Sequence, residues 1–552
     1  MNLIIKATAY VLSAILIFFS SVFHVNIGNK VYYKVDCEKQ GNVIPNIVDN
    51  VNVWDMGTMF YDAVANEENN IFDFVKYVQL MQCTGGNVQR DLFKNPLDNA
   101  TKTDYDFDRL IKNCAGILKL GAKPHLKLGS VPLKLSAGSC ISTDFSTNIY
   151  PPEDYNEYYT YIKAIIEALV KEFGADEVRS WRFGCMTEYE NEDWFMAPSG
   201  NKEDSCIAYL KLYDYTVQAL TDVLGENICV GAHCIGSADT AQSWDETRLL
   251  KHVAQETNYA NGKVGTKISF LAISFYDIAP GNYSANTRPD EAINYFRSVA
   301  QGYGLKDLFY GVDEGRILLG IEGKQINSRM VGYTWQAAYD ARLYKKVIDC
   351  GADYFSNWYY FSNGLMYGNP TITYHFARNI AKFEKSKKLD VKSSLIKTQD
   401  GVESDCLAGF DEETGTLRLM TYNYKNDLNY NCGMNVKFDI DVPQFDKNEV
   451  EITKYLLNDD CNWFDEWVED RKTYNITDEC FSWSPQDPYV ESYTTLYNEN
   501  ARKIYFDNLK EKYKECSKLE AVTTTAKVKN GRLVINEKLD ASNVVFYEIK
   551  MK

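Results

Sequence analysis

Short apolar runs alternate with amphipathic helical patterns eight times along the first two-thirds of the chain. The helical stretches, such as residues 104–120 and 151–173, place apolar side chains at positions i, i+3 and i+4. The eight predicted strands are residues 51–59, 86–92, 123–129, 178–186, 228–234, 268–275, 308–312 and 354–360. Eight successive β-then-α units predict an α/β fold, a (β/α)₈ TIM barrel with insertions in the loops at its mouth.

The competing architecture for such an alternation is an open, doubly wound sheet. That fold usually carries a glycine-rich phosphate-binding turn directly after its first strand. Here the corresponding segment, residues 57–70, reads GTMFYDAVANEENN and contains one glycine. The sequence therefore favours the closed barrel, which we assign to residues 51–385.

The alternation of strand-like and helical patterns ends near residues 383–392. Beyond this point come short alternating strands with turn residues between them, and one helical stretch at residues 496–516. The predicted strands are residues 417–424, 433–442, 449–456, 525–528, 533–535 and 544–549. This pattern predicts a C-terminal antiparallel β-sandwich domain over residues 386–552.

The amino terminus has the composition of a targeting segment. Lys6 is the only charged residue in residues 1–25, and residues 7–23 form an uninterrupted run without charge, glycine or proline. Such a run fits a signal peptide or an N-terminal membrane anchor, with a buried core helix as the alternative. We expect an extracytoplasmic protein, secreted or membrane-anchored, that contacts a membrane only through this segment if it stays uncleaved. Residues 26–50 are expected to be a polar approach segment.

Composition excludes several classes of partner. The net charge of −17 argues against nucleic acid, whose binding requires clusters of lysine and arginine. The 14 cysteines are scattered singly, without a CxxC motif or a Cys/His cluster, so no metal site is expected. No cofactor is predicted, and the sequence gives no indication of the oligomeric state.

Two of the predicted strands end in carboxylates. The run at residues 178–186 is followed by Glu188, Glu190 and Glu192, and the run at 308–312 is followed by Asp313 and Glu314. In a β/α barrel the catalytic groups lie at the carboxyl ends of the strands. Two carboxylates on two different strands are the equipment for glycoside hydrolysis, in which one protonates the leaving oxygen and the other attacks or activates water. The alternative is a pair of solvated acidic loops.

Each of these two acidic groups offers more than one candidate for the catalytic carboxylate. Glu188 is the first acid after its strand, so we prefer it to Glu190 and Glu192 as the acid/base. Adjacent residues of a strand face opposite sides, so only one of Asp313 and Glu314 should point toward the site.

The order of elements and the two acidic strand ends resemble glycoside hydrolase family 39, the group of β-xylosidases and α-L-iduronidases. The family pattern W-x-F-x-x-W-N-E-P-N is matched by Trp181, Phe183 and Glu188, whereas Thr187 replaces the asparagine before the acid. Near the carboxyl end, the segment around Trp463 and Trp467 is similar to the family's D-x-x-x-N-x-x-x-W segment. The resemblance covers residue 51 to the end of the chain.

The resemblance implies roles for the two acids. Glu188, after the fourth strand, would be the acid/base, and Glu314, after the seventh, the nucleophile of a retaining enzyme. The family asparagine bonds the sugar hydroxyl next to the anomeric carbon. Thr187 offers a shorter hydroxyl there, so either the substrate differs or the site is weakened.

Four further residues are candidates for substrate binding, each with a structural alternative. Arg90 would donate to Glu314, or form a structural ion pair. Tyr276 would also donate to the nucleophile, or simply line the mouth. His125 would contact a sugar hydroxyl, or lie in the barrel interior. Trp358 would form a floor under the sugar ring, or pack in the core.

The predicted function is a retaining glycoside hydrolase that cleaves O-glycosidic bonds, with a carbohydrate as its partner and β-xyloside-like compounds as the expected substrates. The alternatives are a glycosidase of another pyranoside, such as an α-L-iduronide, and a catalytically inactive carbohydrate-binding barrel, which the Thr187 substitution favours.

Overall fold

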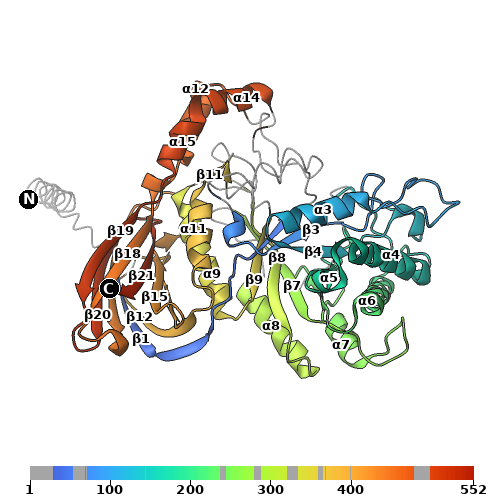
Figure 1. Cartoon of the computed structure of the whole chain (residues 1–552), viewed down its shortest axis with the longest axis horizontal. Coiled ribbons are helices and arrows are strands. Elements are labelled where there is room, and N and C mark those ends of the chain that lie inside the picture. The colour runs from blue at the N-terminus through green and yellow to red at the C-terminus, as the bar shows by residue number, and fades with distance from the viewer. Residues whose placement is uncertain are drawn as a thin grey trace, which may run out of the picture.

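The computed structural model shows a barrel domain and a separate β-sheet domain side by side (Figure 1). No helix in the described part of the chain is long and apolar enough to cross a bilayer. The predicted leader lies outside the described residues. The structure describes residues 29–53, 69, 71–142, 145–236, 244–278, 288–319, 333–358, 365–366, 368–397, 399–477, 496 and 498–552.

Eight parallel strands close into a barrel, in which the first strand, β2, pairs with the last, β9. The predicted (β/α)₈ fold is therefore confirmed. The barrel strands are β2 (Asn50–Val53), β3 (Tyr77–Leu80), β4 (Lys123–Leu128), β5 (Arg182–Cys185), β6 (Cys229–Cys234), β7 (Phe270–Ile278), β8 (Phe309–Leu319) and β9 (Tyr354–Trp358).

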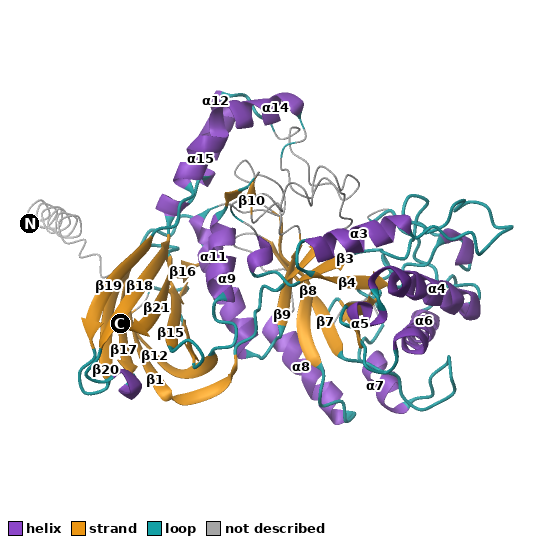
Figure 2. Ribbon diagram, in the orientation of Figure 1, coloured by secondary structure: helices purple, strands orange, loops and turns teal. Residues whose placement is uncertain are grey.

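Helices surround the barrel and cover its outer face (Figure 2). They are α3 (Asp108–Lys119), α4 (Tyr155–Phe173), α5 (Ala175–Arg179), α6 (Lys202–Leu224), α7 (Arg248–Gln255), α8 (Pro289–Gly302), α9 (Thr334–Asp349) and α11 (Ile372–Ala381).

Helix α4 shows how the local sequence sets these elements. The side chain of Asp154 caps the amino terminus by accepting from the backbone N–H of Asn156 at 2.7 Å. Gly174, at φ +87°, ends the helix in a conformation that favours glycine. Between these ends, Tyr158 and Leu169 are buried against the barrel. The helix thus follows the amphipathic pattern of its sequence.

The second predicted strand, residues 86–92, is wrong. The second barrel strand is β3, Tyr77–Leu80, and residues 86–92 form turns beyond it. The strand was hidden because it is short and because it buries the polar Gln79 in the barrel interior. A buried polar residue breaks the apolar run by which the other strands were recognised.

Two further strand boundaries differ from the prediction. The fourth predicted strand began at residue 178, but Val178 lies in α5 and β5 starts only at Arg182. The seventh predicted strand ended at residue 312, whereas β8 continues through Glu314 to Leu319. The second acid therefore lies within a strand, and the first lies beyond one.

The C-terminal domain is built on a nine-stranded sheet in the order β19-β18-β21-β15-β14-β12-β1-β17-β20. All its neighbours are antiparallel except β1 and β17, which run parallel. The strands are β1 (Asn29–Val43), β12 (Lys387–Lys397), β14 (Cys406–Asp411), β15 (Thr416–Tyr422), β17 (Met434–Asp441), β18 (Glu449–Leu457), β19 (Ala521–Lys527), β20 (Arg532–Leu539) and β21 (Val544–Met551).

The two halves of this sheet face one another. Phe438 on β17 and Tyr547 on β21, far apart in the strand order, bring their rings to 5.8 Å. Lys454 on β18 and Glu537 on β20, near opposite ends of the order, form an ion pair at 3.2 Å. One apolar core fills the space between the halves, as in a β-sandwich.

The prediction of a polar approach segment at residues 26–50 is wrong. Its described part, from residue 29, is largely β1, an internal strand of the C-terminal sheet between β12 and β17. The reason is visible in the alternation of buried Val31, Tyr33 and Val35 with more exposed neighbours, which is the period of a strand with one buried face.

A helical insertion projects from the sheet domain, at the top of Figure 1. It consists of α12 (Phe464–Thr473), α14 (Glu499–Ile504), a π-helical turn (Tyr505–Leu509) and α15 (Lys510–Cys516). The insertion holds β11 (Asn369–Pro370), since Trp463 Nε1 donates to the Pro370 carbonyl at 2.8 Å. The short pairs β10 (Leu365–Met366) with β11, and β13 (Val402–Glu403) with β16 (Tyr424–Lys425), complete the strands.

Candidate active site

Two side chains on the same face of β7 contact the two predicted catalytic acids. Ser274 Oγ donates to Glu188 Oε1 at 2.6 Å, and Tyr276 Oη donates to Glu314 Oε2 at 2.9 Å. Residues i and i+2 of a strand share a face, and their Cα atoms are about 6.6 Å apart. Glu188 from the end of β5 and Glu314 from β8 therefore converge over one short stretch of β7.

Glu188 is held by two neutral donors. Besides Ser274, Asn191 Nδ2 donates to its Oε2 at 2.8 Å. Burial raises the pKa of Glu188 above the usual range of a glutamate, and the bonds from Ser274 and Asn191 offset part of this rise. Burial penalises the charged form, so the environment favours a protonated Glu188.

The backbone that presents Glu188 is unusual. Met186 and Glu188 have φ values of +67° and +41°, in the left-handed region that non-glycine residues rarely adopt. Gly129, which follows β4, lies against this turn: a Cβ there would approach Met186 N to 2.9 Å. Strained residues of this kind persist where the surroundings fix them, and they cluster at functional sites.

Glu314 is buried and lies next to a β-bulge. Ile273 pairs with Val312 and the next residue of β7, Ser274, pairs with Glu314, so Asp313 is an extra residue on β8. Adjacent residues of a regular strand face opposite sides, but a bulge changes the direction of the side chains that follow. Asp313 and Glu314 are consequently both buried, at 0% and 7% exposure, and only Glu314 bonds to Tyr276.

Asp313 belongs to a buried charged layer below the two acids. It pairs with Lys127 of β4 and accepts from Tyr354 Oη at 2.5 Å. Two glycines make room for these partners, because a Cβ at Gly184 would lie 2.9 Å from Lys127 and one at Gly311 would lie 2.2 Å from the Tyr354 ring. Asp313 is thus neutralised by a fixed cation and is not a second candidate nucleophile.

His233 on β6 lies between Asp313 of the charged layer and Ser274, which bonds to Glu188. Its Nε2 bonds to Ser274 Oγ at 2.8 Å, and its Nδ1 lies 3.9 Å from Asp313 Oδ2. Burial, together with the charge of Lys127, holds the pKa of His233 well below its usual range, so the imidazole is neutral. Ser274 therefore sits between a neutral histidine and Glu188.

The structure places His125 in the barrel interior. It lies two residues before Lys127 on β4, hence on the same face and one layer deeper, and it is 0% exposed. Its ring packs edge-on against Phe270 and Tyr354. The ring therefore lies in the barrel interior, and the predicted contact with a sugar hydroxyl stays a prediction.

Arg90 is not at the end of a strand, as the sequence had suggested. It lies in the turns after β3, and its Nη1 donates to Gln82 Oε1 at 3.0 Å. Gln82 is the second residue after β3, so the guanidinium reaches back toward the end of the second strand. Its predicted bond to Glu314 stays a prediction.

Thr187 and Trp358 complete the predicted set. Thr187 is buried, and its hydroxyl lies 4.0 Å from the Met81 sulfur. Trp358 is the last residue of β9 and pairs with Asn52 of β2. The Trp358 side chain lies outside the described part of the structure.

The competing acids after β5 are directed elsewhere. Glu190 is buried, and its Oε1 accepts from the backbone N–H of Ile235 at 2.7 Å, after β6. Burial, reinforced by Glu246, raises the pKa of Glu190 well above its usual range. Burial also raises the pKa of Glu246, to about 7. Of Glu188 and Glu190, only Glu188 bonds to β7 in the described structure.

Sequence reasoning missed the residues that support the acids: Ser274, Asn191, His233 and Lys127. One signal was available, because Ser274 and Tyr276 alternate on one face at the end of a predicted strand. The contacts of His233 and Lys127 depend on how distant strands pair.

Comparisons with known proteins identify the family of this chain. The profile of Glycosyl hydrolases family 39 matches residues 87–385. The chain is 28% identical over 127 residues to a β-xylosidase of Geobacillus stearothermophilus and 32% identical over 128 residues to one of Caldicellulosiruptor saccharolyticus. Each match spans 23% of this chain and 24% of the relative, so the chain matches about a quarter of the length of these enzymes. An α-1,4-L-rhamnosidase of Formosa agariphila is 22% identical over 403 residues, 70% of this chain and 75% of that protein.

Solved structures share the two-domain architecture. A monomeric β-xylosidase from Caulobacter crescentus superposes with a TM-score of 0.64 at 15% identity, covering 94% of this chain and 99% of that one. A bacterial orthologue of human α-L-iduronidase gives a TM-score of 0.63 at 12% identity, covering 95% of this chain and 84% of that one. At these identities the likeness concerns the fold.

Proposed function

Because the chain belongs to glycosyl hydrolase family 39, we propose that it is a retaining glycosidase with Glu188 as acid/base and Glu314 as nucleophile. The observation that carries the proposal is the convergence of both acids on Ser274 and Tyr276 of β7. Retaining enzymes hold their two carboxyl groups about 5–5.5 Å apart, closer than inverting enzymes do. Two acids bonded to neighbouring positions on one strand face suit the closer arrangement.

In the first step, Glu314 attacks the anomeric carbon while Glu188 gives its proton to the leaving oxygen. Burial raises the pKa of Glu188 and so shifts this residue toward the protonated form that the step needs. Tyr276 fixes one oxygen of Glu314 and so orients the other for attack. The aglycone leaves as a neutral alcohol, and the sugar remains esterified to Glu314.

In the second step, the ionised Glu188 takes a proton from water as the water attacks the anomeric carbon and releases Glu314. Ser274 suits both steps, because a hydroxyl donates one hydrogen bond and accepts others. It can donate to the ionised Glu188 or accept from the protonated one. Asn191 gives the acid/base a second fixed contact.

The proposed substrates are β-xyloside-like, supported by the β-xylosidases among the relatives. A second candidate is a glycosidase of another pyranoside, an α-L-rhamnoside or α-L-iduronide. The rhamnosidase match spans most of the chain and therefore favours it. Thr187, with its hydroxyl against Met81, presents no amide to the sugar, which also separates this site from the family pattern.

A panel of 4-nitrophenyl glycosides tests the proposal. The full chain should hydrolyse the β-D-xyloside faster than the α-L-iduronide and the α-L-rhamnoside. Proton NMR of the first-formed sugar should show the anomeric configuration of the substrate. A first-formed product of inverted configuration would exclude the nucleophile role of Glu314. Sugar binding without any hydrolysis would point to the inactive carbohydrate-binding barrel.

A further inference from the structure

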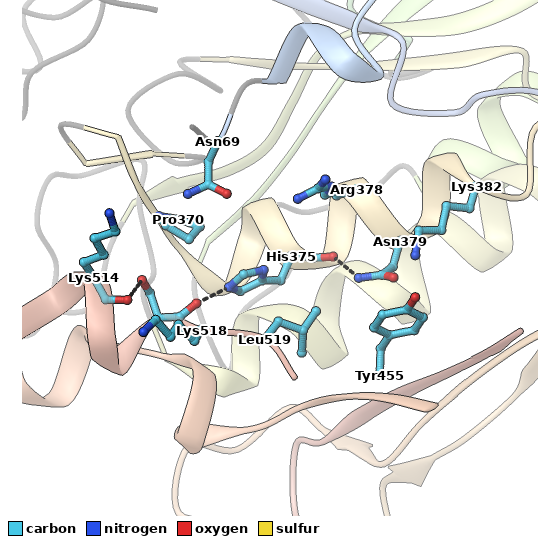
Figure 3. A pocket seen from close by; sticks show the side chains of 11 residues that line it. Asn69, Pro370, His375, Arg378, Asn379, Lys382, Tyr455, Lys514, Lys518 and Leu519 are labelled. Atoms are coloured by element: carbon cyan, nitrogen blue, oxygen red, sulfur yellow. Dashed lines mark hydrogen bonds between the residues drawn. The ribbon is translucent and has the colours of Figure 1, made fainter. Parts of the chain in front are cut away.

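A pocket of about 370 Å³ lies where the barrel, the C-terminal sheet and the helical insertion meet (Figure 3). It is lined by residues of α11, by Tyr455 of β18, and by the end of α15 with the residues that follow it. None of its described lining residues belongs to β5, β7 or β8. It is therefore separate from the two catalytic acids. Concave sites of this size at domain junctions are where small ligands commonly bind.

The pocket concentrates positive charge in an acidic protein. Arg378 lies on α11 and Lys382 directly after it, whereas Lys514 lies on α15 and Lys518 just after that helix (Figure 3). No carboxylate is among the described lining residues, although the whole chain carries a net charge of −17. Elements more than a hundred residues apart thus bring like charges together, which raises the local positive potential.

Existing ion pairs neutralise this charge only in part. Lys382 pairs with Glu548 at 2.8 Å and also lies over the Tyr455 ring. Lys518 pairs with Glu515 at 2.6 Å, but both side chains are more than half exposed, so this pair is weak. Arg378 is exposed, and it forms no hydrogen bond or ion pair with any other described residue.

The floor of the pocket is polar and fixed. His375 Nε2 donates to the Ser517 carbonyl at 2.6 Å and ties α11 to the end of α15. Burial lowers the pKa of His375 to about 4, so its ring is neutral near pH 7. Asn379 Nδ2 donates to the His375 carbonyl at 2.8 Å, and its Oδ1 is buried without a hydrogen-bond partner in the described structure. That oxygen is an acceptor for a ligand hydroxyl.

One helix face supplies most of these groups. His375, Arg378, Asn379 and Lys382 are spaced i, i+3, i+4 and i+7 along and just beyond α11, so they lie on one side of it. Ile372, Phe376 and Ile380 are buried in the apolar core. The polar face is therefore a continuous surface on a rigid element, as a binding site requires.

We propose that this junction pocket is a second binding site, for a small ligand that carries an oxyanion such as a carboxylate or sulfate. The guanidinium of Arg378 pairs with the oxyanion in a bidentate manner. Lys514 and Lys518 add attraction from the opposite wall, and Asn379 accepts from a hydroxyl. The ligand is an acidic sugar or a free inorganic anion, which share this chemistry.

Isothermal titration calorimetry of the full chain tests the proposal with D-glucuronate, D-glucose and inorganic sulfate as probes. Glucuronate or sulfate should bind, more weakly as the salt concentration rises, and glucose should not bind comparably. If glucuronate binds more tightly than sulfate, the ligand of the pocket is an acidic sugar. If the two bind equally, the ligand is a free anion. Both results support the oxyanion site. Absence of binding by both anions at millimolar concentration, or equal binding of glucose, would overturn it.

A matched pair of variants locates the binding. Arg378→Glu should weaken anion binding at least tenfold, whereas Lys306→Glu should leave it within twofold. Both residues are exposed, both substitutions reverse one charge, and Lys306 lies in the loop before β8. Arg378→Glu should hydrolyse aryl glycosides like the unchanged protein, which separates this site from the barrel mouth. Equal losses in both variants would show only a general charge effect and would contradict the site.

Discussion

The ends of β5 and β8 present the same side chain in different ways. Glu188 lies beyond its strand, in a turn with left-handed backbone, and receives bonds from two neutral donors. Glu314 lies within its strand beside a bulge and is bonded by a tyrosine, above the buried pair of Lys127 and Asp313.

The difference shows how one residue type can serve two roles. The environment of Glu188 favours its neutral form, because burial raises its pKa and no cation bonds to it in the described structure. The bulge separates Glu314 from Asp313, so the fixed cation Lys127 neutralises the carboxylate that lies deeper. In a glycosidase, two carboxyl groups of the same residue type can act as acid and as nucleophile when their surroundings differ in this way.

The largest effect should come from substituting Glu314, the acid on β8. Glu314→Gln removes the proposed nucleophile but keeps the shape of the side chain and its contact with Tyr276. Hydrolysis of an aryl glycoside should fall by a factor on the order of 10⁴ or more, because the covalent route is lost. The thermal midpoint should remain close to that of the unchanged protein. Glu192→Gln, in the loop after β5, is the control and should keep its activity; a Glu314→Gln enzyme with near-normal turnover would refute the assignment.

Breaking the β5 side should have an effect that depends on the substrate. Glu188→Ala removes the proposed proton donor, which a poor leaving group needs and an activated aryl group hardly needs. Natural disaccharides should be slowed about 10²–10⁴-fold, and activated aryl glycosides much less in the first step. Azide should restore turnover by replacing water, and should give a glycosyl azide of retained configuration.

Glu190→Ala is the control for this experiment. Glu190 bonds to the backbone after β6 and not to β7, so its removal should produce neither the leaving-group dependence nor the azide rescue. Rescue of Glu190→Ala by azide, with Glu188→Ala unaffected, would move the acid/base two residues along the chain and contradict the present assignment.

The sequence predicted those parts of the molecule that local patterns determine. Seven of the eight predicted barrel strands overlap the observed ones, because hydrophobic periodicity marks them, and the two acids follow from where an apolar run stops. The predicted bond between Tyr276 and Glu314 is present, since these residues lie on the neighbouring strands β7 and β8.

The parts that failed depend on pairing between distant segments. β1 pairs with β12 and β17, hundreds of residues later, and the short run around Tyr33 alone does not reveal this. The bulge at Asp313 changes which side chains face inward, and a bulge has no signal in a single sequence. The depth of His125 in the barrel depends on the register of β4, which the sequence alone does not give.

The smallest effect should come from changing the two hydrogen-bond donors on β7. Ser274 donates to Glu188, and Tyr276 donates to Glu314. Ser274 lowers the pKa of Glu188, so Ser274→Ala should raise that pKa further and keep the acid protonated to higher pH. The alkaline fall of kcat/KM should therefore begin about half to one pH unit later. Tyr276→Phe, the matched variant, should lower kcat about tenfold and leave the alkaline limb in place. An alkaline limb that moves in Tyr276→Phe but not in Ser274→Ala would mean that Ser274 does not set the protonation of Glu188.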